Sequence, residues 1–197
     1  MLDTTAEIIY LTGVILGSIV RGVSVKRSGV RRRGGEFSRV ESVILFFVSL
    51  GMFVIPMLFL FSSWLDFANF SLPAWLSLLA VISGGIVFLL AIWLLWRTHA
   101  DLAENFAPGV ALRENHQLVT TGVFSRMRHP MYSAHLLWSL AQALLLHNWI
   151  AGFSMIITQK FLLIYRIPKE ESRLEDEYGE TYRAYAQKTW RFFPKLY

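Results

Sequence analysis

The 197-residue sequence contains no cysteine, and only 17% of its residues are charged. The absence of cysteine excludes disulfides, thiolate metal sites and a cysteine nucleophile. Because 54% of the residues are apolar and 15% are aromatic, the chain is too apolar for an average soluble domain, and it is too short for two large domains. This composition predicts an all-α, multi-pass integral membrane protein that forms one structural domain.

Acidic residues are also scarce. The chain has 14 Asp and Glu but 19 Lys and Arg, so its formal net charge is +5. The basic residues lie beside apolar runs and not in a separate basic domain, so membrane topology explains them better than nucleic-acid binding does. The five histidines show no His-Glu-x-x-His motif and no other ligand spacing, so we expect no metal site. His99, His135 and His147 match no motif and are interpreted as interfacial or packing residues.

Five apolar segments follow one another along the chain, at residues 8–20, 43–61, 74–96, 131–146 and 150–165. The second and third have nineteen and twenty-three residues without a charge, enough to cross about 30 Å of hydrocarbon. Pro56 should kink the second segment. The last two are separated only by residues 147–149, which predicts an antiparallel helical hairpin that either penetrates the bilayer deeply or spans a thinned one.

The basic residues are distributed unevenly between the two sides of these segments. Eighteen of the nineteen lie in residues 21–39, 97–128 and 166–197, and none lies in the predicted outside loops. This asymmetry predicts an N-terminus outside the membrane and a C-terminus and candidate site on the cytoplasmic side. The remaining residue, Lys160, lies near the inner end of its segment, where its long side chain can reach the interface.

Residues 118–132 carry the most informative local pattern, Leu-Val-Thr-Thr-Gly-Val-Phe-Ser-Arg-Met-Arg-His-Pro-Met-Tyr. Pro130 can take the first position of a helix and biases His129 away from helical backbone angles. Arg128 and His129 are therefore expected just outside the start of a membrane helix. Gly122 and the threonines before it predict a turn that offers backbone N–H groups to a ligand. By itself, this pattern fits a ligand pocket and an ordinary basic loop equally well.

A second polar stretch follows the last apolar segment. Pro168 is expected to open a new surface helix, with Glu170 and Glu171 in its acidic first turn. Gly179 is expected to break that helix into two pieces.

Together these residues resemble the isoprenylcysteine carboxyl methyltransferase family over residues 97–197. The resemblance is carried by His116-x-Leu118-Val119-x-x-Gly122, Arg128-His129-Pro130-x-Tyr132, the apolar hairpin, Arg166, Glu170-Glu171 and Tyr178-Gly179-x-x-Tyr182-x-x-Tyr185. Phospholipid N-methyltransferases and some sterol reductases are similar in parts of this half. The chain departs from many members at Val123-Phe124, where they have Pro-Tyr, and at Ser133-Ala134, where they have a glycine. These departures affect the expected substrate more than the expected cofactor.

The five apolar segments predict five transmembrane helices, with residues 1–96 as a membrane anchor, and the resemblance implies a catalytic region at residues 97–197. It also implies S-adenosylmethionine as methyl donor, bound in a cytoplasmic pocket, and a lipophilic acceptor, foremost the carboxylate of a prenylated cysteine. The cofactor contacts that it implies come from His116, Gln117, Leu118, Val119, Gly122, His129, Tyr132 and Glu170. The alternatives are a phospholipid amine N-methyltransferase, an NADPH-dependent membrane reductase and a non-catalytic scaffold that binds anionic lipid.

The two acceptor types need different catalytic groups. A carboxylate is already ionised near neutral pH, so it needs a cation to hold it and no base. Arg166 is the candidate clamp with Glu171 as its orienting partner, and Arg128 is the alternative clamp. An amine acceptor would require a base, and His129 or Glu170 would take that role. Ordinary ion pairing at the start of a solvated helix is the other interpretation of Arg166 and the two glutamates.

Overall fold

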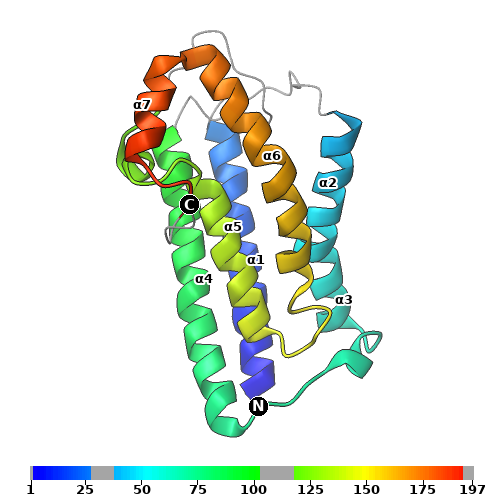
Figure 1. The fold of residues 1–197 in the computed structure, drawn as a ribbon. Coiled ribbons are helices and arrows are strands. Elements are labelled where there is room, and N and C mark those ends of the chain that lie inside the picture. Colours follow the sequence, from blue (N-terminus) through cyan, green and yellow to red (C-terminus); the bar gives the residue numbers. More distant parts are fainter. Residues whose placement is uncertain (1, 28–37, 103–117, 193–197) are drawn as a thin grey trace.

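The computed structural model describes residues 2–27, 38–102 and 118–192, and every regular element in these ranges is helical (Figure 1). In chain order the elements are α1 (Leu2–Arg27), α2 (Arg39–Ser49), the π-helical turn η1 (Leu50–Val54), α3 (Ile55–Phe61), the 3-10 turn η2 (Asp66–Ala68), α4 (Ala74–Leu102), the 3-10 turn η4 (Gly122–Ser125), α5 (Pro130–Leu145), α6 (Ser154–Tyr178) and α7 (Glu180–Lys188).

The long helices form a bundle with two distinct ends. The start of α1, the connection from α3 to α4 and the turn between α5 and α6 lie at one end, and α7 lies at the other (Figure 1). Residues 2–27, 39–61 and 74–102 are long and apolar enough to cross a membrane. Their outward faces expose large apolar side chains such as Phe46 and Leu89, which is favourable in lipid and unfavourable in water. The protein is therefore an integral membrane protein.

The core lies where α5 packs against α4 and α1. Its largest fully buried side chains include Trp138 on α5 and Phe88 on α4. Glycines on α1 allow close approach, because a Cβ at Gly13 would lie 2.4 Å from the Phe88 ring and one at Gly17 would lie 2.4 Å from the Trp138 ring. This packing fixes the position of α5, and with it the polar residues at its start.

The segment in which Pro56 was predicted to cause a kink contains the π-helical turn η1 just before the proline. The N–H of Ile55 bonds to the carbonyl of Leu50, five residues earlier. Pro56 has no N–H, so the carbonyl of Met52 loses its usual helical donor. The carbonyl of Gly51 also lacks its usual helical donor, because the N–H of Ile55 donates to the Leu50 carbonyl instead.

Buried polar side chains from three other elements satisfy these two carbonyls. Gln142 Nε2 and Ser154 Oγ lie 3.1 and 2.8 Å from the Gly51 carbonyl oxygen. The Tyr10 hydroxyl lies 3.2 Å from the Met52 carbonyl oxygen and 2.9 Å from Gln142 Oε1. The network joins α1, η1, α5 and α6 in the apolar interior, where an unsatisfied carbonyl would be costly.

The helical hairpin is confirmed, because α5 and α6 run antiparallel (Figure 1). Its turn is longer than predicted, since residues 146–153 lie between the two helices. Asn148 accounts for the difference. Its Oδ1 accepts hydrogen bonds from the N–H groups of Ile150 and Ala151, and its Nδ2 donates to the Leu65 carbonyl and Asn69 Oδ1. These bonds hold residues 149–151 in a turn and attach it to the loop after α3.

The prediction that Pro168 opens a new helix was wrong, because α6 continues through Pro168 to Tyr178. The missing N–H removes one helical hydrogen bond, but residues just beyond the proline contact other helices. Lys169 forms an ion pair of 3.1 Å with Glu41 of α2, and Glu170 accepts a hydrogen bond from Tyr132. Gly179, with a φ of 51°, ends α6 as predicted, and α7 begins at the next residue.

Candidate active site

Pro130 occupies the first turn of α5 as predicted, and His129 has non-helical backbone angles, with φ −123° and ψ 61°. Arg128 and His129 therefore lie just outside the start of the helix, at its cytoplasm-facing end in the predicted topology. His129 is only 3% exposed.

The segment that follows α7 holds these two residues in place. Met127 and Trp190 form an isolated parallel β-bridge. The N–H of Arg128 donates to the Trp190 carbonyl at 2.7 Å, and the N–H of His129 donates to the Arg191 carbonyl at 3.1 Å. Neither N–H is left for a ligand.

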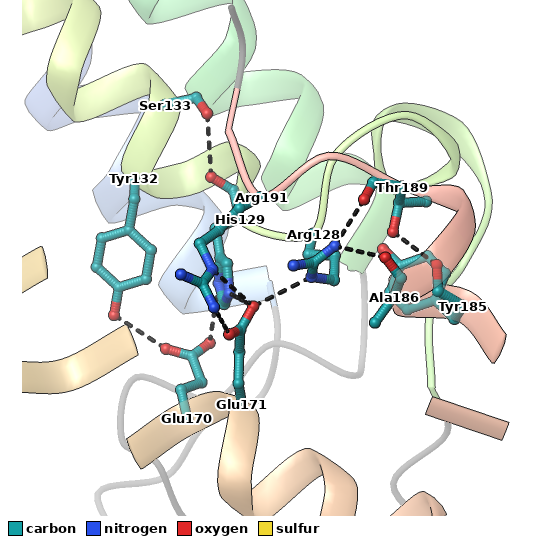
Figure 2. Close-up of polar contacts among 10 residues, drawn as sticks. All are labelled: Arg128, His129, Tyr132, Ser133, Glu170, Glu171, Tyr185, Ala186, Thr189 and Arg191. Atoms are coloured by element: carbon teal, nitrogen blue, oxygen red, sulfur yellow. Dashed lines mark hydrogen bonds and ion pairs between the residues drawn. The ribbon is translucent and has the colours of Figure 1, made fainter. Parts of the chain in front are cut away.

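Glu171 of α6 is the centre of the polar cluster (Figure 2). Its Oε1 accepts a hydrogen bond from Arg128 Nε at 3.1 Å and lies 3.2 Å from His129 Nε2. The Arg191 guanidinium contacts both carboxylate oxygens. Burial by itself would raise the pKa of Glu171, but the hydrogen bonds with His129, Arg191 and Arg128 outweigh it and lower that pKa to about 2. Glu171 is thus ionised near neutral pH and is not a general base.

Arg128 connects the start of α5 to the end of α7. Besides its bond to Glu171, its Nη1 donates to the Ala186 carbonyl at 2.8 Å and to the Thr189 carbonyl at 2.6 Å (Figure 2). A cation at the last carbonyls of a helix is favourably placed. Because protein groups already use three hydrogen bonds of its guanidinium, Arg128 has the geometry of a positioning residue more than that of an acceptor clamp.

Glu170 is the more open of the two glutamates, with its side chain 33% exposed against 14% for Glu171. Its Oε2 accepts a hydrogen bond from the Tyr132 hydroxyl at 2.9 Å, and its Oε1 lies 4.0 Å from His129 Nδ1. The Oε1 atom therefore retains hydrogen-bonding capacity toward a ligand, beside two of the residues predicted to bind the cofactor.

The expected pairing of Arg166 with Glu171 is not formed, because the ion pairs of Glu171 are with Arg128, His129 and Arg191. Two residues five positions apart on a helix point about 140° away from each other, at roughly 100° per residue. Arg166 lines a shallow groove between α2 and α6. The groove is also lined by Glu41, Ile44, Leu45, Leu162 and Tyr165.

The turn at Gly122 docks on α4. Gly122 has a φ of 62°, and a Cβ at this position would lie 2.1 Å from Asp101 Oδ2. The same oxygen accepts a hydrogen bond from the N–H of Val123 at 2.8 Å, and Asp101 also pairs with Arg97. The predicted turn is present, but the N–H of Val123 is bound by the protein and is not offered to a ligand.

Of the remaining predicted cofactor residues, the structure describes only two. Leu118 and Val119 are half-buried in the segment that leads to this turn. His116 and Gln117 lie outside the described residues. Among the described residues, no group of three or more His, Asp and Glu side chains could hold a metal ion.

Sequence reasoning missed Arg191 and Asp101. Arg191 lies 20 residues after Glu171 and outside every motif, so only the β-bridge reveals their contact. Asp101 lies in the i+4 position from Arg97, and this spacing explains their ion pair but not the bond to Val123.

Comparison with known proteins places this cluster in a family context. Residues 83–176 match the model of the isoprenylcysteine carboxyl methyltransferase family. The chain is similar to protein-S-isoprenylcysteine O-methyltransferase B of Arabidopsis thaliana, with 40% identity over 75 residues, or 38% of each chain. It is also similar to a probable protein-S-isoprenylcysteine O-methyltransferase of Oryza sativa subsp. indica, with 30% identity over 123 residues, or 61% of each chain.

Among solved structures, the chain resembles the eukaryotic intramembrane Ras methyltransferase of this family, with a TM-score of 0.55 and 21% identity over 87% of this chain and 60% of that chain. At this identity the likeness concerns the fold. In all three comparisons, the matched segment covers less than two thirds of the length of the relative. The resemblance to the isoprenylcysteine carboxyl methyltransferase family, which the sequence motifs indicated, is confirmed over residues 83–176.

Proposed function

We propose that this protein transfers the methyl group of S-adenosylmethionine to the carboxylate of a prenylated cysteine. One observation carries the proposal. The motif before α5 and the paired glutamates of α6 are about forty residues apart, and they meet in one hydrogen-bonded cluster within the stretch that matches the family model (Figure 2). Ionisable residues that gather at a membrane helix indicate a functional site.

The described residues suit a cationic cofactor. S-adenosylmethionine supplies a sulfonium methyl group that is already an activated electrophile, so no further activation is required of the protein. Glu170 offers a carboxylate oxygen, and Tyr132 and His129 lie beside it. We assign the cofactor site to Leu118, Val119, Gly122, His129, Tyr132 and Glu170, together with His116 and Gln117, which lie outside the described residues.

The acceptor site is assigned to the groove between α2 and α6. Ile44, Leu45 and Leu162 line it with apolar side chains that a prenyl chain would contact, and Arg166 supplies a guanidinium for the carboxylate. The protein needs mainly to align the acceptor and exclude water, effects worth up to about 7–11 kcal/mol. Glu171 and Arg128 are assigned positioning roles, because each is held by several groups of the protein.

We further propose that the chain crosses the membrane five times, with its N-terminus outside and its cofactor site in the cytoplasm. The 16 residues of α5 extend about 24 Å at 1.5 Å per residue, slightly less than the hydrocarbon thickness. The first part of α6, to Tyr165, would complete the hairpin. Residues 1–96 would form the anchor and residues 97–197 the catalytic region of one structural domain, since α4 crosses that boundary.

The test is methyl transfer by the purified protein to a farnesylated cysteine analogue and to phosphatidylethanolamine, between about pH 6 and 9. A carboxylate with a pKa near 4 is ionised throughout this range, whereas an ammonium with a pKa near 10 must first lose a proton. We expect transfer to the cysteine analogue with little pH dependence, and loss of most activity in Arg166→Lys because one ammonium cannot replace the guanidinium fork. Arg173→Lys, an exposed change on the same helix, serves as the control.

Two outcomes would contradict the proposal. Transfer only to the lipid amine, with a rate that rises with pH and an active Arg166→Lys variant, would favour the phospholipid methyltransferase. Calorimetric binding of NADPH but not of S-adenosylhomocysteine would favour the reductase, and binding of neither would leave the scaffold. Weakened S-adenosylhomocysteine binding in folded His129→Ala and Tyr132→Ala variants would support the assigned cofactor site.

A further inference from the structure

An ion pair between Glu41 and Lys169 joins α2 to α6 beside the groove assigned to the acceptor. The two helices lie side by side, and Lys169 Nζ is 3.1 Å from Glu41 Oε1 (Figure 1). Glu41 is only 5% exposed, although it belongs to a segment that is apolar enough to cross a membrane. A buried ionisable residue in such a segment is a candidate functional residue.

The Glu41 carboxylate has a second partner at the start of its own helix. Its Oε2 accepts a hydrogen bond from the N–H of Ser38 at 2.9 Å, and the N–H of Glu41 donates to Ser38 Oγ at 3.2 Å. This reciprocal arrangement is a capping box, which places the carboxylate at the positive end of the helix dipole. Glu41 therefore keeps a hydrogen bond and a favourable field even when Lys169 is not bound to it.

The ammonium group of Lys169 lies at the edge of the groove. Besides its contact with Glu41, its Nζ lies 5.5 Å from the centre of the Tyr165 ring. Glu41 and Tyr165 both line the groove, as does Arg166. Arg166 is three positions before Lys169, a spacing at which side chains are neighbours on a helix. The side chain of Lys169 is 31% exposed, and a lysine has a flexible stem that allows its charge to change partners.

We propose that Lys169 is a second recognition residue for the acceptor carboxylate, beside Arg166, and that Glu41 holds its ammonium group until the acceptor binds. The acceptor carboxylate then replaces Glu41 as the partner of Lys169, while Glu41 stays bonded to the cap of α2. The inference rests on the proposed function, because it adds a recognition residue to the assigned acceptor site.

A purely structural ion pair gives a different expectation for Glu41→Gln. If the pair only fastens α2 to α6, loss of the charge loosens this contact and cannot strengthen binding of the acceptor. If Glu41 competes with the acceptor for Lys169, loss of the charge strengthens binding of a carboxylate acceptor. Glutamine is accepted at the third position of a capping box, so the variant preserves the start of α2.

Calorimetry on the full-length protein in detergent tests the exchange with a farnesylated cysteine analogue and its carboxamide. The ratio of their two Kd values measures the preference for the carboxylate. We expect Glu41→Gln to raise this preference by about threefold to tenfold and Lys169→Gln to lower it by a similar factor, because Lys169 is partly exposed. Lys160→Gln and Glu177→Gln, at exposed positions of α6, should keep the wild-type preference.

A double variant, Glu41→Gln with Lys169→Gln, shows whether the gain acts through Lys169, and most of the gain should disappear in it. The inference is overturned if Glu41→Gln leaves the preference unchanged or lower, if Lys169→Gln keeps the wild-type preference, or if the full gain persists in the double variant. Should Lys169→Gln not fold, Glu41→Gln decides the question by the direction of its effect.

Failure of the proposed function has a different signature. The wild-type protein would then neither bind S-adenosylhomocysteine nor methylate the cysteine analogue. Failure of the inference alone would leave methyl transfer intact and the carboxylate preference unmoved by the change at Glu41.

Discussion

Replacing Glu171 by glutamine should destabilise the protein near neutral pH, and by an amount that depends on pH. The contacts with Arg128, His129 and Arg191 lower the pKa of Glu171 from its usual 4.5 to about 2. At 1.36 kcal/mol per pKa unit, this lowering of the pKa corresponds to a contribution to the free energy of unfolding of at most about 3 kcal/mol. Solvent screening on the open side of the cluster, where Arg191 is partly exposed, reduces the expected loss to about 2 kcal/mol.

The pH dependence follows from the direction of the pKa change. A carboxyl group whose pKa is lower in the folded protein contributes its full stabilisation above its unfolded pKa, here above about pH 5. That stabilisation is lost as the pH falls from about 4.5 to about 2, because protonation of Glu171 then removes the charge. The difference between the wild-type protein and Glu171→Gln should therefore be largest at pH 7 and should shrink toward pH 3.

Thermal unfolding followed by tryptophan fluorescence in detergent measures this difference. At about 2–4 °C per kcal/mol, the midpoint of Glu171→Gln should lie roughly 4–8 °C below that of the wild-type protein at pH 7. Asp176→Asn makes the same chemical change at an exposed position of α6 and should leave the midpoint within about 1 °C. Equal midpoints at pH 7, or a difference that is the same at pH 7 and pH 3, would refute the role assigned to the Glu171 charge.

Three further predictions concern other parts of the molecule. Gln142→Leu removes the donor to the Gly51 and Ala151 carbonyls and should lower stability in detergent by about 1–3 kcal/mol. As a control, Leu140→Ala on the exposed face of α5 should cost much less stability. Equal losses of stability in the two variants would show that the network is not stabilising. Gly122→Ala should cost about 1–3 kcal/mol and weaken S-adenosylhomocysteine binding, because φ is 62° and the new Cβ would meet Asp101; an unchanged melting temperature would contradict this. Cysteines at the exposed positions Asn69 and Gln187 should be labelled from opposite sides of sealed vesicles, and labelling from one side would exclude the proposed topology.

The sequence by itself predicted the features that depend on a few neighbouring residues. Uninterrupted apolar length located the long membrane helices at residues 39–61 and 74–102, because a helix in lipid must satisfy its backbone internally. Pro130 fixed the start of α5 through its locked φ, and Gly179 ended α6 because it tolerates a positive φ. These are local backbone constraints, so no knowledge of distant contacts was required.

Only the tertiary structure decided which groups meet in the polar cluster. Glu171 takes its partners from 43, 42 and 20 residues away, and not from Arg166, five positions earlier on its own helix. The contacts of α6 with α2 and α5 just beyond Pro168 likewise join residues that are far apart in the sequence. The physical reason is that an ion pair requires two side chains to converge in space. Helix packing sets that convergence, whereas composition and spacing set only which side chains are available.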